Sequence, residues 1–456
     1  MSEVAIVRRD ADAAGLARLR EAAAAAALLG DEELPRFAVA GVVPRAVVAP
    51  DSVEAVARTL ALCSAQGWPV EPAGAATWLV AGAPPGTPPV VISTARIGAI
   101  REYEPADLVV GVEAGMPLDA LAGELATQRQ SIPLDPPAAP GATIGAAIAL
   151  ASAGPLRAAH GTPRDMVLGV EAIAGDGRVL RFGGRVVKNV AGYDLVRLLV
   201  GSRGAFALLT SLFIRLRSVP DVDSTTIVAA DDLTDAVALA AEIRRRMSPD
   251  ALEVIGPGLA AQVLPAGAAA ARWTVLVRLR GTDAAVGEMT ERLGRITGSS
   301  AEKPGPDVAP AIWQAAGMSE AGAPLCFRVA DLPSRLSQSA AAVLRITDAV
   351  FAAGAAGEAL DWRVAIHAAD GIVRAWPAAL PWEDALARLA SDLSALAAEL
   401  ANAGATVSWP VWPAFAEAAR VALTDSGAAR QRLLTELKAR FDPAGILSPS
   451  RHVAGL

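Results

Sequence analysis

The apolar residues of this chain occur in short runs that alternate between strand-like and helix-like spacing. Residues 42–50 form an apolar run bounded by prolines, which is typical of a strand. Residues 53–61 then repeat apolar side chains at helical spacing behind Asp51 and Ser52, which can cap a helix. Extended structure resumes at residues 69–72. This strand–helix–strand order predicts a small α/β unit.

Apolar runs of strand length continue through the rest of the first half of the chain. The Gly-Asp-Gly turn at residues 175–177 separates two of them and predicts a β-hairpin. The strands expected in this half cover residues 90–93, 108–113, 167–174, 179–182 and 205–216.

After Pro220 the strands and helices are longer and more widely spaced. We expect helices at residues 231–246 and 284–293, strands at 273–280 and 362–366, and a strand–helix pair over 325–345. This pattern predicts a second, α+β domain, with the boundary near residues 219–224.

Composition excludes several classes of protein. A chain of 456 residues is long enough for two or three domains, and its 53% hydrophobic fraction is largely alanine, so we expect no transmembrane segment and no secretory signal. A net charge of −7 without basic clusters argues against nucleic-acid binding. Cys63 and Cys326 are predicted to be buried free thiols in the reducing cytoplasm. Because no Cys-x-x-Cys spacing occurs, the chain itself has no set of ligands for an iron–sulfur cluster.

Three segments rich in glycine and small residues are candidates for a cofactor site. The first is the loop Glu71-Pro-Ala-Gly-Ala-Ala-Thr-Trp78, whose backbone N–H groups can converge on a diphosphate. An ordinary turn is the alternative. We assign to the site the residues Pro72, Ala73, Gly74, Ala75, Ala76 and Thr77.

The second segment runs from Leu134 to Gly169 and alternates prolines with glycines. Prolines stiffen a loop and glycines permit close contact with a planar ligand. The residues assigned to the site here are Gly141, Ala142, Thr143, Ile144, Gly145, Gly154 and Arg164. An ion pair between Arg164 and Asp165 that stabilises the loop is the alternative role of that arginine.

The third segment is Lys188-Asn-Val-Ala-Gly-Tyr-Asp194, which places a lysine, an amide, a phenol and a carboxylate within seven residues. Asn189 and Tyr193 are assigned to the cofactor site, and a purely structural role for Tyr193 and Asp194 stays open. A proline- and glycine-containing tail, Asp442-Pro-Ala-Gly-Ile-Leu-Ser-Pro-Ser-Arg451, follows near the end of the sequence.

These segments, in this order, resemble the FAD-binding oxidoreductases of the PCMH or vanillyl-alcohol-oxidase type, and in particular the FAD-binding subunit of glycolate oxidase. The resemblance implies an α+β fold: a PCMH-type FAD-binding domain of two α/β subdomains, an α+β cap domain, and a C-terminal tail that returns to the FAD domain. The expected parts are a helical lead-in at residues 1–35, the FAD domain at 36–219, the cap at 220–439 and the tail at 440–456. The usual Gly-x-Gly-x-x-Gly fingerprint of dinucleotide folds is absent.

FAD is the cofactor that the resemblance implies, bound non-covalently because the phosphate loop has no histidine, cysteine or tyrosine to attach it. Relatives that oxidise 2-hydroxy acids hold a metal with a pair of histidines in the second domain. Here His367 is present, but Arg374 stands at the second position, and arginine does not ligate metals. No metal site is expected, and the sequence identifies no catalytic base.

The leading hypothesis is therefore an FAD-binding oxidoreductase subunit for small 2-hydroxy acids. The implied partners are glycolate-oxidase-type catalytic and iron–sulfur subunits, in the cytoplasm or at the inner membrane through those partners. Two alternatives stay open: an assembly subunit that binds FAD weakly or not at all, and a stand-alone flavin dehydrogenase for another alcohol or acid.

Overall fold

A computed structural model describes most of the chain. The described residues are 13–23, 28–80, 84–184, 194–265, 272–298, 301–352, 361–379, 395, 398–400, 402, 404–411 and 428–449.

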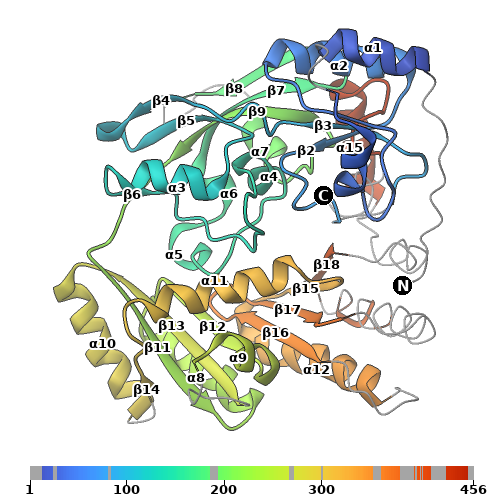
Figure 1. The fold of residues 1–456 in the computed structure, drawn as a ribbon. Coiled ribbons are helices and arrows are strands. Elements are labelled where there is room, and N and C mark those ends of the chain that lie inside the picture. The colour runs from blue at the N-terminus through green and yellow to red at the C-terminus, as the bar shows by residue number, and fades with distance from the viewer. Residues whose placement is uncertain are drawn as a thin grey trace.

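The elements alternate as the sequence predicts, and the mixed α+β class is confirmed (Figure 1). The helices are α1 (Ala13–Ala23), α2 (Val53–Gln66), α3 (Leu118–Ala126), α4 (Ile144–Ala149), α5 (Arg157–His160), α6 (Pro163–Met166), α7 (Leu195–Leu199), α8 (Leu233–Arg246), α9 (Pro257–Val263), α10 (Asp283–Thr297), α11 (Val308–Ala321), α12 (Leu336–Ala352) and α15 (Ala428–Phe441), with the 3₁₀ helices η2 (Asp31–Phe37), η3 (Pro105–Asp107) and η5 (Pro333–Arg335). The strands are β1 (Ala46–Val48), β2 (Val70–Ala73), β3 (Val90–Ser93), β4 (Ile100–Glu104), β5 (Val109–Glu113), β6 (Gln130–Ser131), β7 (Val167–Ala174), β8 (Val179–Gly183), β9 (Ala207–Arg215), β10 (Arg217–Ser218), β11 (Val222–Ala230), β12 (Ala251–Ile255), β13 (Trp273–Gly281), β14 (Ala301–Glu302), β15 (Cys326–Ala330), β16 (Trp362–His367), β17 (Ile372–Pro377) and β18 (Thr406–Val411).

The first α/β unit is a parallel sheet of order β1-β3-β2, against which α1 and α2 pack. Helix α2 begins where predicted, because the Ser52 side chain accepts a hydrogen bond from the amide of Ala55. It ends at Gly67, which adopts a left-handed φ of +62° and accommodates it without a Cβ. The loop after β2 is therefore held at the carboxyl edge of a parallel sheet.

The second unit of the first half is an antiparallel sheet of order β4-β5-β9-β7-β8. The predicted hairpin is confirmed as β7 and β8, whose register pairs Ile173 with Val179 across the turn. One face of this sheet packs against α3, α4 and α7 in a continuous apolar core. Helix α4, which carries part of the second candidate segment, is thereby held between the two sheets.

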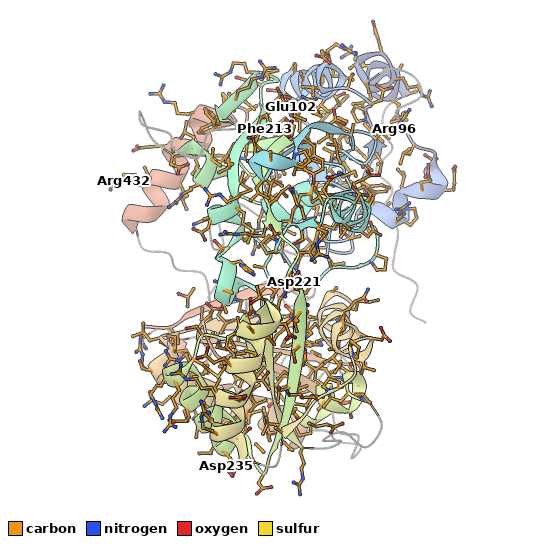
Figure 2. The ribbon with its side chains drawn as sticks, turned by 90° about the vertical axis from the view of Figure 1, so that its left-hand side faces the viewer. Arg96, Glu102, Phe213, Asp221, Asp235 and Arg432 are labelled. Carbon is orange, nitrogen blue, oxygen red and sulfur yellow. The ribbon has the colours of Figure 1, made fainter. Side chains whose placement is uncertain are left out.

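The second half of the chain contains an antiparallel sheet of order β14-β11-β13-β12-β16-β17-β15-β18 among the described residues. Helices α8, α10 and α12 supply apolar side chains to one face of this sheet. Helices α9 and α11 cover the other face, and α11 lies between the two halves of the molecule (Figure 1). Figure 2 shows Asp221 at the junction of the halves, where it pairs with Arg129 at 2.8 Å.

The end of the described chain returns to the first half. Leu434, Leu437 and Phe441 of α15 pack against the core of the five-stranded sheet. Lys438 donates to the carbonyls of Ala205 and Leu447, each at 2.6 Å. These contacts anchor the tail beside β2.

Cys63 and Cys326 are free and buried, as predicted. Within the described ranges, no helix has the length and apolar character needed to cross a bilayer.

Candidate cofactor site

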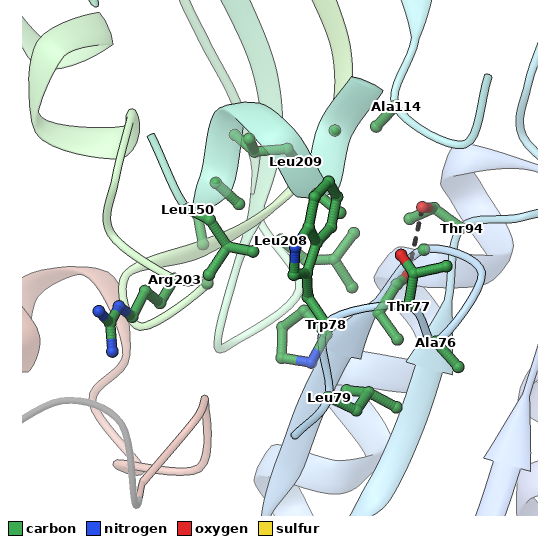
Figure 3. Close-up of a pocket in the computed structure, with 18 residues that line it drawn as sticks. Ala76, Thr77, Trp78, Leu79, Thr94, Ala114, Leu150, Arg203, Leu208 and Leu209 are labelled. Atoms are coloured by element: carbon green, nitrogen blue, oxygen red, sulfur yellow. Dashed lines mark hydrogen bonds between the residues drawn. The ribbon is translucent and has the colours of Figure 1, made fainter. Parts of the chain in front are cut away.

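A pocket lies between the parallel sheet and the five-stranded sheet, where the first and second candidate segments meet. It has a volume of about 70 Å³. Of the residues assigned from the sequence, Pro72, Ala73, Gly74, Ala76, Thr77 and Gly145 line it, whereas Ala75 does not. Figure 3 shows the Trp78 ring inside this pocket, with Leu150 and Leu208 beside it.

The backbone amides of the loop at residues 74–77 are available to a ligand. In the described part of the chain, none of these amides donates a hydrogen bond, although Gly74 is buried. Ala76 adopts a left-handed φ of +68°. A left-handed residue within a turn directs successive amides toward one point, and such an arrangement binds anions. The loop therefore has the donors that a diphosphate needs.

Gly74 and Thr143 join the first candidate segment to the second. A Cβ on Gly74 would lie 2.0 Å from the Oγ1 atom of Thr143. The φ of Gly74 is not positive, so a left-handed backbone is not what requires a glycine here. The glycine is required because the two loops approach each other closely. Thr143 is buried, and its hydroxyl accepts a hydrogen bond from the amide of Ala146 at the start of α4.

The remaining residues of the second segment are distributed around this contact. Ile144 is fully buried in the core, and Gly141 and Ala142 line a different cavity, between the two halves of the chain. Gly154 packs on the neighbouring loop, because a Cβ there would lie 1.9 Å from the carbonyl oxygen of Asp135.

Arg164 has a structural contact different from the one considered in the sequence. Its Nε donates to the carbonyl of Val200 at 3.3 Å. Asp165 accepts instead from the amide and hydroxyl of Thr162, both at 2.8 Å, in a capping box. The alternative Arg164–Asp165 ion pair is therefore replaced by two separate contacts. Asn189 and Tyr193 lie outside the described residues.

The C-terminal tail forms hydrogen bonds next to the phosphate loop. Ser448 in the tail has a φ of +41°, and its single hydroxyl proton is shared between Glu71 at 3.3 Å and the carbonyl of Arg203 at 3.2 Å. Glu71 is buried within β2, which ends at Ala73 directly before the loop. The tail thereby connects the two walls of the pocket.

A second cluster of polar side chains is buried where the halves of the molecule meet. His367 contacts Glu253 through Nδ1, and Arg374 binds Glu320 and also Glu253, the latter at 3.1 Å. Burial lowers the pKa of His367 well below its usual value, so the imidazole is neutral and its contact with Glu253 is a hydrogen bond. Although burial opposes it, the two glutamates raise the pKa of Arg374. Arg374, at the position where the resemblance implies a second histidine, therefore binds both glutamates.

Two buried carboxyl groups of this cluster were not recognised as site residues. Burial raises the pKa of Asp135 to about 7, against hydrogen bonds from the amide of Leu156. Burial also raises the pKa of Glu253 to about 7, against the charge of Arg374. A carboxyl group that titrates near neutrality can act as a general base. The Asp135-Pro-Pro turn was the only sequence signal for this role.

Contacts across the junction hold the halves in register. Arg157 of α5 lies 3.6 Å from Asp370, and His160 lies 3.8 Å from Asp250. Burial, with the charge of Arg280, lowers the pKa of His160. His160 thus contributes to the junction rather than standing free beside the pocket.

Comparison with known proteins agrees with this geometry. A family model described as an FAD binding domain matches residues 44–183, which contain both the phosphate loop and Thr143. The solved structure of p-cresol methylhydroxylase with substrate bound superposes with a TM-score of 0.77, at 16% identity over 96% of both chains. Alkyldihydroxyacetonephosphate synthase superposes with a TM-score of 0.64, at 15% identity over 88% of this chain and 76% of that one. These solved structures confirm the α+β fold of the PCMH type, and the matched family model makes FAD the cofactor that the domain at residues 44–183 indicates.

Curated relatives narrow the resemblance within that class. Glycolate oxidase subunit GlcD of Bacillus subtilis is 30% identical over 213 residues, 46% of this chain and 45% of that protein. Glycolate oxidase subunit GlcE of Escherichia coli is 43% identical over 122 residues, 26% of this chain and 35% of that protein. A D-lactate dehydrogenase of Archaeoglobus fulgidus is 36% identical over 220 residues, 46% of this chain and 48% of that protein. The chain spans about half or less of the length of these relatives.

Proposed function

We propose that this chain is the FAD-binding subunit of an oxidoreductase that oxidises small 2-hydroxy acids. The observation that carries the proposal is the loop at residues 74–77, whose amides donate no hydrogen bond within the described chain and which lines the pocket beside Thr143. The relatives named for glycolate and D-lactate support the choice of substrate class.

The residues of this chain would bind and orient the cofactor. The amides of residues 74–77 would bind the diphosphate, in a loop that Gly74 allows to pack closely against Thr143. We propose the same role of cofactor contact for Asn189 and Tyr193, on the resemblance alone. When bound, FAD supplies the redox chemistry, and the protein supplies position and electrostatics. We propose that it is bound non-covalently.

Asp135 is the residue that we propose as proton acceptor from the substrate hydroxyl. It lines a small inner cavity between the halves of the chain, together with Glu253 and Arg374. Its pKa of about 7 allows it to be ionised and to accept a proton near neutral pH. The Asp135→Asn variant should lower the rate of flavin reduction by roughly 10²-fold or more without loss of bound FAD.

We propose that electrons leave through a partner subunit that carries iron–sulfur clusters. The two cysteines of the sequence are buried, at Cys63 and Cys326, and do not form a cluster motif. The relatives named as glycolate oxidase subunits support a complex of several chains. We further propose that residues 36–219 form the FAD domain and residues 220–439 the greater part of the cap.

Anaerobic mixing of the FAD-loaded chain with glycolate or D-lactate tests whether this chain needs partner subunits for rapid oxidation of the substrate. We expect slow reduction of the flavin by the lone chain, because Arg374 and its glutamates leave no place for a metal that polarises the substrate. Addition of the catalytic and iron–sulfur partners should restore rapid turnover. Rapid, metal-dependent reduction by the lone chain would contradict the subunit assignment.

A second candidate is an assembly subunit that retains the fold but binds FAD weakly. The observation that favours it is the small volume of the pocket, about 70 Å³, where ligand pockets commonly have roughly 300–1,000 Å³. The Trp78 ring lies in that space (Figure 3). Titration of the flavin-free chain with FAD separates the two, because the assembly role predicts a dissociation constant far above the micromolar range.

A further inference from the structure

A second cavity, distinct from the cofactor pocket, lies at the junction of the two halves. It has a volume of about 400 Å³ and lies between the loop at residues 134–142 and one face of α11. Cavities of roughly 300–1,000 Å³ at domain junctions are the usual places for small-molecule ligands. This cavity shares no lining residue with the cofactor pocket, and its size fits a small-molecule ligand.

The outer cavity leads toward the inner cavity that contains Glu253. Asp135, Trp313 and Gly317 line both. The inner cavity is narrow, at about 20 Å³, so it admits little more than one polar group of a ligand. The bulk of a molecule that reached the inner cavity would remain in the outer one.

The walls of the outer cavity suit an apolar or aromatic body. They consist mainly of prolines, alanines and leucines together with Met318 and Trp313. The Trp313 ring is held in place, because its Nε1 donates to Thr225 at 2.9 Å and the Arg278 guanidinium lies 5.6 Å from the ring centre. A rigid aromatic wall favours contact with a flat or branched apolar group.

One arginine lines the outer cavity, together with the carboxyl groups of Asp119 and Asp135. This arginine, Arg278, binds Asp223 at 2.6 Å, which holds its guanidinium in place beside the cavity. A guanidinium group fixed in this way can bind the carboxylate of an acid ligand.

From these four observations we propose that the outer cavity binds the side chain of a 2-hydroxy acid larger than glycolate, with an apolar or aromatic side chain. The proposal rests on the function proposed above and names the substrate class of that enzyme. A two-carbon acid would leave nearly all of the apolar wall in contact with water. A phenyl group in the cavity should tighten binding by about 10-fold or more relative to glycolate.

Gly317 is the position where this proposal can be tested without damage to the fold. It lies on α11, and a Cβ there would lie 3.7 Å from the Cα of Pro137, an ordinary contact. A leucine at this position would extend between α11 and the loop and fill the passage. Because glycine disfavours helices by about 1 kcal/mol relative to alanine, Gly317→Leu should not weaken α11. Gly287→Leu is the matched control, since Gly287 lies on α10 with open space around its Cβ position.

Calorimetric titration of the FAD-loaded chain with D-3-phenyllactate, glycolate and 2-phenylethanol gives the answer. We expect phenyllactate to bind more tightly than either other probe, by about 10-fold or more. Gly317→Leu should remove this difference in affinity, and Gly287→Leu should retain it. Equal binding of phenyllactate and glycolate, or an unchanged advantage in Gly317→Leu, would overturn the proposal.

The same titration separates this inference from the proposed function. A chain that carries no flavin but binds phenyllactate in a manner sensitive to Gly317→Leu would disprove the enzyme and retain the cavity. A chain that carries FAD but binds all three probes equally would retain the proposed function and overturn the proposal for the cavity.

Discussion

Ala76 is the residue at which backbone strain in the phosphate loop can be measured. Its φ of +68° lies in the left-handed region, which costs a residue with a Cβ roughly 1–2 kcal/mol. Replacement by glycine removes that cost but adds about 0.5–1 kcal/mol of entropy to the unfolded chain. The net expectation for Ala76→Gly is a gain of about 1 kcal/mol in the free energy of unfolding.

Ala75→Gly is the matched control, because Ala75 precedes it in the same loop without a positive φ. There the entropy term acts alone, and we expect a loss of about 0.4–1 kcal/mol. The urea concentration at the midpoint of unfolding should therefore rise in Ala76→Gly and fall in Ala75→Gly. The release of FAD on unfolding is measured as an increase in the fluorescence of free FAD. If Ala76→Gly released FAD at a lower urea concentration than the parent protein, the left-handed conformation of this loop would be refuted.

Three further predictions follow from packed contacts. Gly74→Ala should abolish FAD retention, because the new Cβ would lie 2.0 Å from Thr143 Oγ1. The added change Thr143→Ala should partly restore the flavin content of the purified protein. If it does not, the loss of FAD has a cause other than this contact. Arg374→Met should lower the free energy of unfolding by about 3–5 kcal/mol in chemical denaturation, because it removes the cationic partner of two buried glutamates and leaves Glu253 only its contact with His367. A loss below about 1 kcal/mol would contradict the buried pairing. Burial raises the pKa of Asp135 to about 7, above its ordinary value in the unfolded chain, so the folded state retains a proton that the unfolded state loses. The free energy of unfolding should therefore fall as pH rises from about 4 to 7, by up to about 1.4 kcal/mol per pH unit. The parent protein should show this slope more steeply than Asp135→Asn, and equal slopes would refute the raised pKa.

The parts of the fold that local spacing specifies were predictable. Strand β3 and the β7–β8 hairpin occur where the apolar runs and the Gly-Asp-Gly turn place them. Strand β12 was missed, although it lies at the centre of the large sheet, because Glu253 interrupts its apolar run. The Glu253 side chain is accommodated through its contacts with Arg374 and His367, which lie far away in sequence. No short stretch of the sequence contains Glu253 together with these two partners.

The candidate site shows the same division between local and long-range information. The individual motifs around Gly74 and Thr143 were visible as loops rich in small residues, and the structure places them in contact. Why Gly74 must be glycine could not be inferred, since the cause is a neighbour from another segment. Asp135 likewise gains its altered pKa only when the halves of the chain bury it. Burial by distant elements is the information that a single sequence does not display.

The most direct test of cofactor binding is the visible absorption spectrum of the purified full chain, before and after acid precipitation. We predict a flavin spectrum with about one FAD per chain, and we predict that all of the yellow colour passes into the supernatant when the protein is precipitated. A chain that is colourless and takes up no added FAD would contradict the assignment of this pocket, and colour retained in the pellet would contradict non-covalent binding.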